Sequence, residues 1–213
     1  MTTIVPTTPE VSTLLLFGAG GHARVVADAA LLTPAWRHVL ACDRDPARCV
    51  GELLPDVPLL PLLDAGRIDT MVHVAIGNNA AREREAAFWG HERLVTVVHP
   101  QAVLSPFARL EAGCFVAAGA IVGPGARVGP GTIINHAAII DHDVQVGAFS
   151  HIAPHATLGG AVGIGRRVLV GAGAVVLPGV TVADDVVIGA GAVVREALLE
   201  PGTYVGVPAR RVQ

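Results

Sequence analysis

Asp141-His142-Asp143 is the segment of this sequence best suited to acid–base chemistry. An imidazole titrates near neutral pH, and a carboxylate beside it can orient the ring and raise its basicity, as a general base requires. These residue types make His142 a candidate base and Asp143 its orienting acid. The competing interpretation is a surface histidine beside a surface aspartate, since both types are common on exposed turns.

The segment lies within a repeat of six residues. A period of six fits neither an amphipathic helix, with a period of about 3.6, nor a flat strand, with a period of about 2. Each hexad instead predicts one short strand and one turn, and three hexads make a coil with the aliphatic side chains stacked inside. The aliphatic residues occupy every sixth position without a gap, at Leu104, Leu110, Val116, Val122, Val128, Ile134, Ile140, Val146, Ile152, Leu158, Ile164, Val170, Val176, Val182, Ile188 and Val194.

The repeat predicts a prism-shaped parallel β-helix of about five coils, roughly 24 Å tall at a spacing of about 4.8 Å per coil. Glycine directly follows the aliphatic residue in many hexads, as at Gly123 and Gly147, and is expected to permit tight turns. Gly160 is one coil of residues after His142 and therefore stacks next to it. Its backbone N–H could stabilise the oxyanion of a tetrahedral intermediate, which makes Gly160 a third candidate catalytic residue.

Histidine clusters can also bind metal ions, so the spacing of the prism histidines matters. His136 and His142 are six residues apart and lie on adjacent faces, whereas His151 and His155 occupy other hexad positions. Convergence of all four on one ion is therefore not expected, and we predict no metal.

The first hundred residues indicate a different module. A buried strand at 11–17 is followed by Gly18-Ala19-Gly20-Gly21-His22-Ala23 and a helix at 24–32. Glycines at this spacing let backbone N–H groups approach a pyrophosphate at a helix N-terminus. The alternative is that Gly18 and Gly20 serve only tight packing of the strand on the helix.

Two further strands end in polar loops. The strand at 38–42 precedes Asp43 and Arg44, where an acidic residue can bind a ribose or base, and the strand at 70–76 precedes Gly77-Asn78-Asn79 and a helix at 80–89. Residues 53–63 are expected to form an irregular connector. These units predict a small open, Rossmann-like α/β domain over 1–98, followed by the β-helix over 99–213. The candidate substrate-binding residues are Gly20, Gly21, His22, Asp43, Arg44, Gly77 and Asn78.

Composition narrows the class of protein. Apolar residues make up 52% and charged residues 15%, which excludes a disordered chain. The net charge is −3 and the basic residues are scattered arginines, so no nucleic-acid partner is expected. Glycine and proline interrupt every long apolar stretch, and no signal peptide is visible, so we predict a cytoplasmic protein with no membrane association. Its three cysteines suit reduced structural thiols.

Several motifs resemble one family. They are Gly18-Ala19-Gly20-Gly21-His22, Ala75-Ile76-Gly77-Asn78-Asn79, Asp141-His142-Asp143 through Phe149-Ser150-His151, and Gly206-Val207-Pro208-Ala209-Arg210. Together with the hexads they resemble the hexapeptide-repeat acyltransferases, in the branch of sialic-acid O-acetyltransferases and nucleotide-aminosugar N-acetyltransferases of the bacillosamine or perosamine type. The resemblance implies a left-handed β-helix, a homotrimer, and acetyl-CoA in the groove between neighbouring prisms.

The resemblance also implies residue roles. The matching histidine, His142, is the family's proposed base, followed by an acidic residue that is usually Glu and here is Asp143. His151 matches a position that contacts acetyl-CoA, Ala172 and Ala190 match backbone positions that line the pantetheine groove, and Arg210 is a candidate phosphate contact. The α/β domain would hold the nucleotide diphosphate of the sugar, so acetyl-CoA rather than NAD is the expected co-substrate.

The sequence is compatible with three functions. The leading hypothesis is transfer of acetyl from acetyl-CoA to the 4-amino group of a UDP- or GDP-linked 4-amino-4,6-dideoxysugar for surface polysaccharide or glycan synthesis, such as O-antigen. The alternatives are O-acetylation of sialic acid or another sugar hydroxyl, which needs a true base, and a nucleotide-sensing scaffold without turnover. With an amine acceptor, His142 could be either a base or a positioning group.

Overall fold

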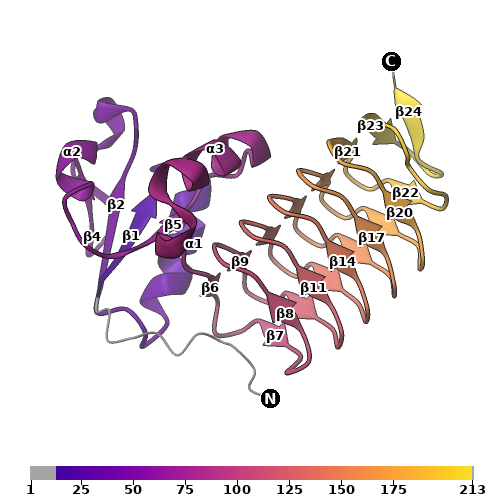
Figure 1. Ribbon diagram of the computed structural model, residues 1–213, viewed down its shortest axis with the longest axis horizontal. Coiled ribbons are helices and arrows are strands. Elements are labelled where there is room, and N and C mark those ends of the chain that lie inside the picture. The colour runs from indigo at the N-terminus through magenta and orange to yellow at the C-terminus, as the bar shows by residue number, and fades with distance from the viewer. Residues whose placement is uncertain (1–12, 213) are drawn as a thin grey trace.

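The computed structural model describes residues 13–212 and divides them into two parts. An α/β domain is followed by a long prism of short strands that extends to the C-terminus (Figure 1). The predicted fold class, a Rossmann-like domain ahead of a parallel β-helix, is confirmed. No helix among the described residues is long and apolar enough to span a membrane.

The α/β domain contains a five-stranded sheet in the order β3-β4-β2-β1-β5. All neighbouring strands are parallel except β3 and β4. The strands are β1 (Thr13–Phe17), β2 (His38–Cys42), β3 (Glu52–Leu54), β4 (Val57–Leu60) and β5 (Met71–Val74). The helices are α1 (Gly21–Leu31), α2 (Leu62–Ala65) and α3 (Asn79–Trp89), and the 3-10 turns are η1 (Pro46–Arg48) and η2 (His91–Arg93).

The structure corrects two expectations in this domain. Helix α1 begins at Gly21 rather than at residue 24, so the glycine loop runs directly into its first turn. The expectation of an irregular connector at 53–63 was wrong, because the segment contains β4 and parts of β3 and α2. Its prolines suggested a loop, but Leu53 and Val57 are buried in the domain core, which favours ordered strands. The first two residues predicted for β1 lie outside the described residues.

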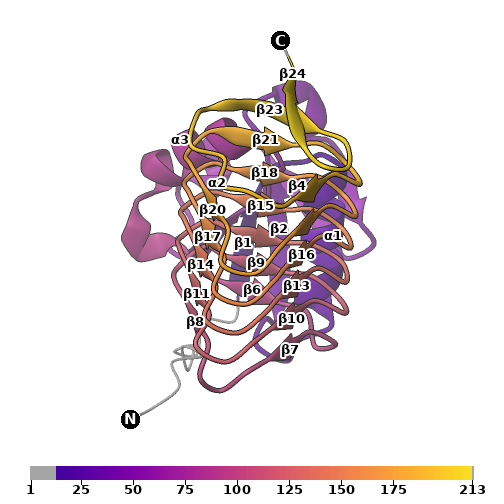
Figure 2. The same ribbon diagram turned by 90° about the vertical axis from the view of Figure 1, so that its right-hand side faces the viewer.

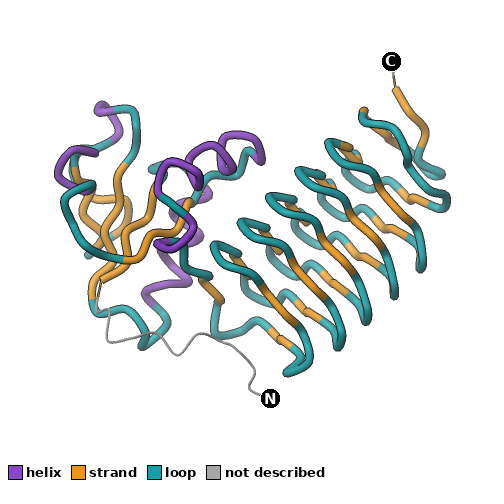
Figure 3. Tube along the Cα trace, in the orientation of Figure 1, coloured by secondary structure: helices purple, strands orange, loops and turns teal. Residues whose placement is uncertain are grey.

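The prism consists of three stacked sheets, which Figure 3 shows as short strands separated by regular turns. The first sheet contains β6 (Val97–Val98), β9 (Phe115–Val116), β12 (Ile133–Ile134), β15 (His151–Ile152), β18 (Leu169–Val170), β21 (Val186–Ile188), β23 (Gly202–Val205) and β24 (Arg210–Val212). The second contains β7 (Val103–Leu104), β10 (Ile121–Val122), β13 (Ile139–Ile140), β16 (Thr157–Leu158), β19 (Val175–Val176) and β22 (Val193–Val194). The third contains β8 (Arg109–Leu110), β11 (Arg127–Val128), β14 (Gln145–Val146), β17 (Gly163–Ile164) and β20 (Thr181–Val182).

Turn geometry repeats as regularly as the sequence. The residue three places after each inward aliphatic residue has a positive φ in every hexad from Gly113 to Gly191, glycine or not. The glycines expected to permit these turns, such as Gly147, are not the residues with positive φ. They are needed because a Cβ at 147 would overlap the backbone of Gly165 in the next coil.

The α/β domain packs against the outer face of the first sheet. Phe115 and Ile133 point outward from this sheet and belong to the core of the α/β domain. Figure 2 shows the strands of the first sheet stacked upward from β6, whose partner in the prism is β9. The prism therefore gains its first strand directly before the boundary proposed at 98/99.

Candidate active site

His142 and Asp143 lie together in the turn between β13 and β14, on an exposed edge of the prism. The Nδ1 of His142 lies 2.9 Å from Oδ2 of Asp143, and the backbone N–H of His142 donates to Asp141 Oδ1 at 2.7 Å. The hydrogen bond to Asp143, and next the charge of Asp141, raise the pKa of His142. When Nδ1–H donates to the carboxylate of Asp143, the neutral ring presents Nε2 as a proton acceptor.

Gly160 lies next to this imidazole in the following coil. The N–H of Ala161 donates to the carbonyl of His142 at 2.9 Å, which fixes the register of the two turns. A Cβ at 160 would overlap Nε2 of His142, so only glycine leaves room for the ring. No hydrogen bond within the described residues uses the N–H of Gly160. A proton acceptor and a free backbone donor therefore lie side by side.

Ala172 and Ala190 lie in stacked turns on a different edge, between the first and second sheets. Both are exposed, and among the described residues neither N–H has a hydrogen-bond partner. The N–H of Gly191 donates to the carbonyl of Ala172 at 2.8 Å, which holds the two turns in register. Arg210 is exposed on β24, and its Nη1 donates only to its neighbour's carbonyl, Ala209 O. The N–H groups of Ala172 and Ala190 and the guanidinium of Arg210 suit a ligand that carries amide groups along its length and a phosphate at its end.

His151 lies on β15, where the α/β domain covers the prism. Its Nε2 is 3.1 Å from the amide nitrogen of Asn135, and its ring centroid is 6.3 Å from that of His22 in the first turn of α1. Burial, and next the Arg82 charge, lower the pKa of His151 to about 4. Burial lowers the pKa of His22 to about 3, and the buried Nε2 of His22 has no hydrogen-bond partner within residues 13–212. Both rings are neutral at pH 7.

Asn135 is a further candidate site residue, which the sequence did not single out. It directly follows the inward Ile134, at a hexad position that often carries glycine or alanine. Its side chain contacts His151 and also accepts from the N–H of His136 at 2.9 Å. The signal that could have found it is a polar residue at this position, two residues after Ile133, which pairs with His151 in the next coil.

The glycines of the loop between β1 and α1 differ in their surroundings: one is packed closely and two face open space. A Cβ at Gly18 would meet Ala75 O at 2.8 Å, so Gly18 serves the packing of adjacent strands. A Cβ at Gly20 or Gly21 would meet nothing within 4 Å, so these two border open space at the α1 N-terminus. The packing alternative therefore applies to Gly18 alone. Asp43 holds the loop, because its Oδ2 accepts from the N–H of Ala19 at 2.9 Å.

The other two polar loops are fixed by helix α3. Asn78 is the N-cap of α3, and its Oδ1 accepts from the N–H of Ala81 at 2.9 Å. The space beside Gly77 is open. Arg44 is held by Glu85 through two-pronged hydrogen bonds of 2.7 to 2.9 Å and lies 4.8 Å above the ring of Phe88.

The candidate residues thus form separate groups within one chain. His142, Asp143 and Gly160 occupy one edge of the prism, while His22 and His151 lie under the α/β domain. No hydrogen bond, ion pair or ring contact in the described part of the chain joins the two groups. No cluster of three or more His, Cys, Asp or Glu side chains within residues 13–212 is placed to hold a metal ion.

Comparison with known proteins gives the same architecture. Residues 13–87 match the PglD N-terminal domain, and residues 161–196 match the bacterial transferase hexapeptide repeats. The perosamine N-acetyltransferase PerB of Caulobacter crescentus, solved with CoA and GDP-perosamine, is 33% identical to this chain, with a TM-score of 0.84. The match covers 95% of this chain and 98% of that chain.

A second solved relative is the acetyltransferase domain of PglB from Neisseria gonorrhoeae FA1090. It is 34% identical with a TM-score of 0.87, and 94% of this chain and all of that chain (100%) are covered. The same domain has been solved with acetyl coenzyme A. WeeI from Acinetobacter baumannii AYE, at 19% identity and a TM-score of 0.61, shares the fold. The prism is accordingly a left-handed β-helix, as predicted, and the chain belongs to the family of acetyl-CoA-dependent sugar N-acetyltransferases that join a PglD-type N-terminal domain to hexapeptide repeats.

Proposed function

We propose that this enzyme transfers acetyl from acetyl-CoA to the 4-amino group of a UDP- or GDP-linked 4-amino-4,6-dideoxysugar. The observation that carries the proposal is the His142–Asp143 pair, whose Nε2 lies beside the free N–H of Gly160. The relative from Caulobacter crescentus, solved with GDP-perosamine, supports an aminosugar acceptor.

The reaction is a direct transfer within a ternary complex. The sugar amine attacks the thioester carbonyl carbon, so a C–N bond forms and the C–S bond breaks. Nε2 of His142 takes the proton that the amine loses and returns it to the departing CoA thiolate. Asp143 stabilises the charged ring, and the N–H of Gly160 donates to the developing oxyanion. Because a neutral amine is a good nucleophile, positioning contributes strongly to the rate.

The diphosphate of the sugar nucleotide binds in the α/β domain. The open space at Gly20 and Gly21, at the N-terminus of α1, suits an anionic group. Asp43 fixes this loop, and Gly77 and Asn78 border the neighbouring strand end. The family resemblance assigns His151 to acetyl-CoA, but because His151 lies beside His22 where the α/β domain covers the prism, we propose that it faces the sugar instead. His22 and His151, both neutral, would offer hydrogen-bonding nitrogens to the sugar without repelling an ammonium group.

We also propose a homotrimer, in which neighbouring prisms bring the two groups of residues together. An exposed apolar stripe runs along the outer face of the second sheet, where Val103 is 61%, Ile121 41% and Ile139 37% exposed. Such a stripe is typical of a subunit interface. The pantetheine arm would follow Ala172 and Ala190 of one subunit toward His142 of another, with Arg210 at the phosphate end.

A cytoplasmic location belongs to the same proposal. Cys42, Cys49 and Cys114 are all free. Burial raises the pKa of the Cys42 and Cys114 thiols to about 12, so both are inert structural thiols suited to a reducing compartment. A surface polysaccharide or glycan is the proposed destination of the sugar.

Thiol release from acetyl-CoA with a panel of acceptors tests the proposed function. The panel contains UDP- and GDP-linked 4-amino-4,6-dideoxysugars, the same nucleotides without the amine, and sialic acid. Turnover is expected with a nucleotide-linked aminosugar and not with the other compounds. Turnover with sialic acid alone would instead support O-acetylation.

A further inference from the structure

Arg82 is a fully buried arginine without a carboxylate partner among the described residues. Its side chain is bonded only to neutral oxygens, and burial lowers its pKa to about 9. Removing a charged guanidinium from water is costly unless every donor is used, so this arrangement needs a reason. The acceptors are Ile76 O (2.9 Å), Gly77 O (3.0 Å), Asn79 Oδ1 (2.8 Å), Gly131 O (2.6 Å), Phe149 O (2.8 Å) and Ser150 O (3.2 Å).

These acceptors belong to two different parts of the molecule. Nη1 holds the carbonyls of Ile76 and Gly77, at the end of β5 in the α/β domain. Nη2 holds the carbonyls of Phe149 and Ser150, which directly precede His151 on the prism. One planar side chain therefore sets the position of the Gly77 loop relative to His151.

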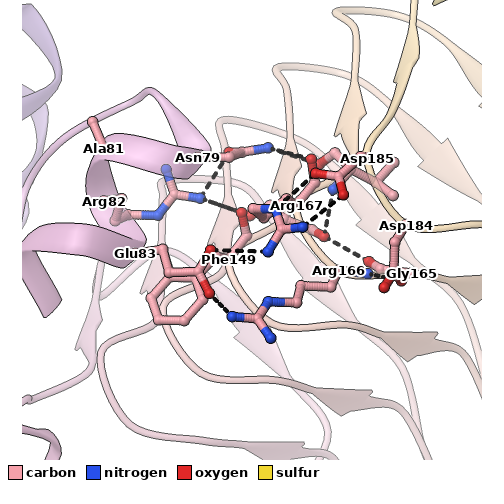
Figure 4. A network of polar contacts seen from close by, with 12 residues as sticks. Asn79, Ala81, Arg82, Glu83, Phe149, Gly165, Arg166, Arg167, Asp184 and Asp185 are labelled. Carbon is pink, nitrogen blue, oxygen red and sulfur yellow. Dashed lines mark hydrogen bonds and ion pairs between the residues drawn. The ribbon is translucent and has the colours of Figure 1, made fainter. Parts of the chain in front are cut away.

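Asn79 extends the contact from the same face of α3, one turn before Arg82. Its amide nitrogen donates to the carbonyls of Arg167 at 3.0 Å and Val168 at 3.1 Å, while its Oδ1 accepts from Arg82 (Figure 4). Glu83 adds half-buried ion pairs to Arg166 and Arg167. Helix α3 thus binds three successive coils.

The next turn of α3 fixes the second polar loop. Glu85, whose side chain is 2% exposed, holds Arg44 beside Asp43. The loops at the ends of β2 and β5 are therefore both attached to α3. Because α3 is itself hydrogen-bonded to the prism, the two loops and the His151 coil belong to one connected set of contacts.

We propose that Arg82, assisted by Asn79, is a positioning residue for the acceptor: it fixes the nucleotide-sugar loop at Gly77 relative to His151. The inference rests on the proposed function, since it assigns the Gly77 loop to the sugar nucleotide. A purely structural role is the competing explanation, but the half-buried ion pairs of Glu83 with Arg166 and Arg167 already join α3 to the prism.

The test compares Arg82→Lys and Asn79→Ala with Arg93→Lys. Lysine keeps the charge but concentrates its donors at one point, so it cannot span the two sets of carbonyls. Arg93 is a matched control, because its guanidinium also donates to backbone carbonyls, of Ile68 and Thr70, and lies 5.1 Å above Trp89. It lies at the opposite end of β5 and holds no prism carbonyl.

Kinetics with each substrate separate positioning from stability. Arg82→Lys is expected to lower kcat/KM for the nucleotide sugar about 100-fold, the usual effect of misplacing a substrate by about 1 Å, with KM for acetyl-CoA unchanged. Asn79→Ala should act in the same direction, and Arg93→Lys should change melting temperature alone. A raised KM for acetyl-CoA in Arg82→Lys, or the same kinetic loss in Arg93→Lys, would overturn the proposal. If Arg82→Lys does not fold, Asn79→Ala decides the question.

Hydrogen exchange gives a readout that does not depend on turnover. In Arg82→Lys, peptides covering residues 75–79 and 149–152 are both expected to exchange faster than in the wild type, whereas Arg93→Lys should leave 149–152 unchanged. Unaltered exchange in both peptides would refute the positioning role. If Arg82→Lys exchanges faster in both peptides but the wild-type enzyme shows no turnover with any aminosugar, the proposed function alone would be refuted.

Discussion

The imidazole of His142 occupies the space beside Gly160 that a side chain at position 160 would fill. Two turns one coil apart are held in register by the hydrogen bond from Ala161 N to His142 O. The β-helix thereby converts a spacing along the chain into a contact in space. The contact brings a proton acceptor on one coil close to a backbone donor on the next, the two kinds of group that the proposed acyl transfer uses.

Gly160→Ala should displace the His142 ring without deforming the backbone, because Gly160 does not have a positive φ. The expected loss in kcat is about 100-fold, the effect of misplacing a catalytic group by about 1 Å. Gly163→Ala is the matched control, since a Cβ there meets only Thr181 at 3.8 Å. Equal activity of both variants would exclude close contact between residue 160 and the working imidazole.

His142→Ala should lower kcat by roughly 10² to 10⁴ if His142 is an obligatory base, with little change in the KM for acetyl-CoA. If the ring only positions a neutral amine, the loss is smaller and shrinks as the pH rises toward the pKa of the amine. A pH–rate profile of the variant distinguishes these cases. Wild-type rates at every pH would remove His142 from the mechanism.

Asp143→Asn should move the acidic limb of the pH–rate profile. Asp143 raises the pKa of His142, so its removal lowers that pKa and extends the neutral, active ring to lower pH. The plateau rate should nevertheless fall, because the ring is a weaker base and is no longer oriented by the carboxylate. Asparagine tolerates the positive φ of 58° at this position, so the turn is retained. A limb that moves to higher pH would contradict the assignment.

The prism was predictable from sequence because its period appears in every coil. The aliphatic positions identify the interior, and a fixed coil length then places Gly160 next to His142. The contacts between the two parts were not predictable in this way. His22, Asn135 and His151 come from distant segments, and Arg82 on α3 has the sequence signature of an ordinary exposed helix residue. Its burial follows only from how the α/β domain packs on the prism.

Acid should destabilise the protein through its buried histidines. His73 is 1% exposed, and burial lowers its pKa to about 4, so below pH 6.5 the unfolded chain binds a proton that the native chain does not. Stability therefore falls as the pH drops from 6.5 toward 4. His73 alone contributes about 2 kcal/mol of this loss between pH 7.5 and pH 5.

His73→Asn is the variant that tests this, because asparagine can keep a donor for Val95 O, now held by Nδ1 at 2.9 Å, and cannot titrate. Denaturant unfolding at the two pH values should show a smaller decrease in the variant than in the wild type. The same decrease in both proteins would show that His73 does not carry the acid sensitivity.

The position of the transferred acetyl group tests the central claim most directly. The wild-type enzyme is incubated with acetyl-CoA and the best acceptor of the nucleotide-sugar panel, and the product is analysed by mass spectrometry and NMR. We expect one acetyl group in an amide at the C4 nitrogen of a sugar that is still linked to its nucleoside diphosphate. An ester on a sugar hydroxyl, or no acetylated product with any UDP- or GDP-linked aminosugar, would contradict the account.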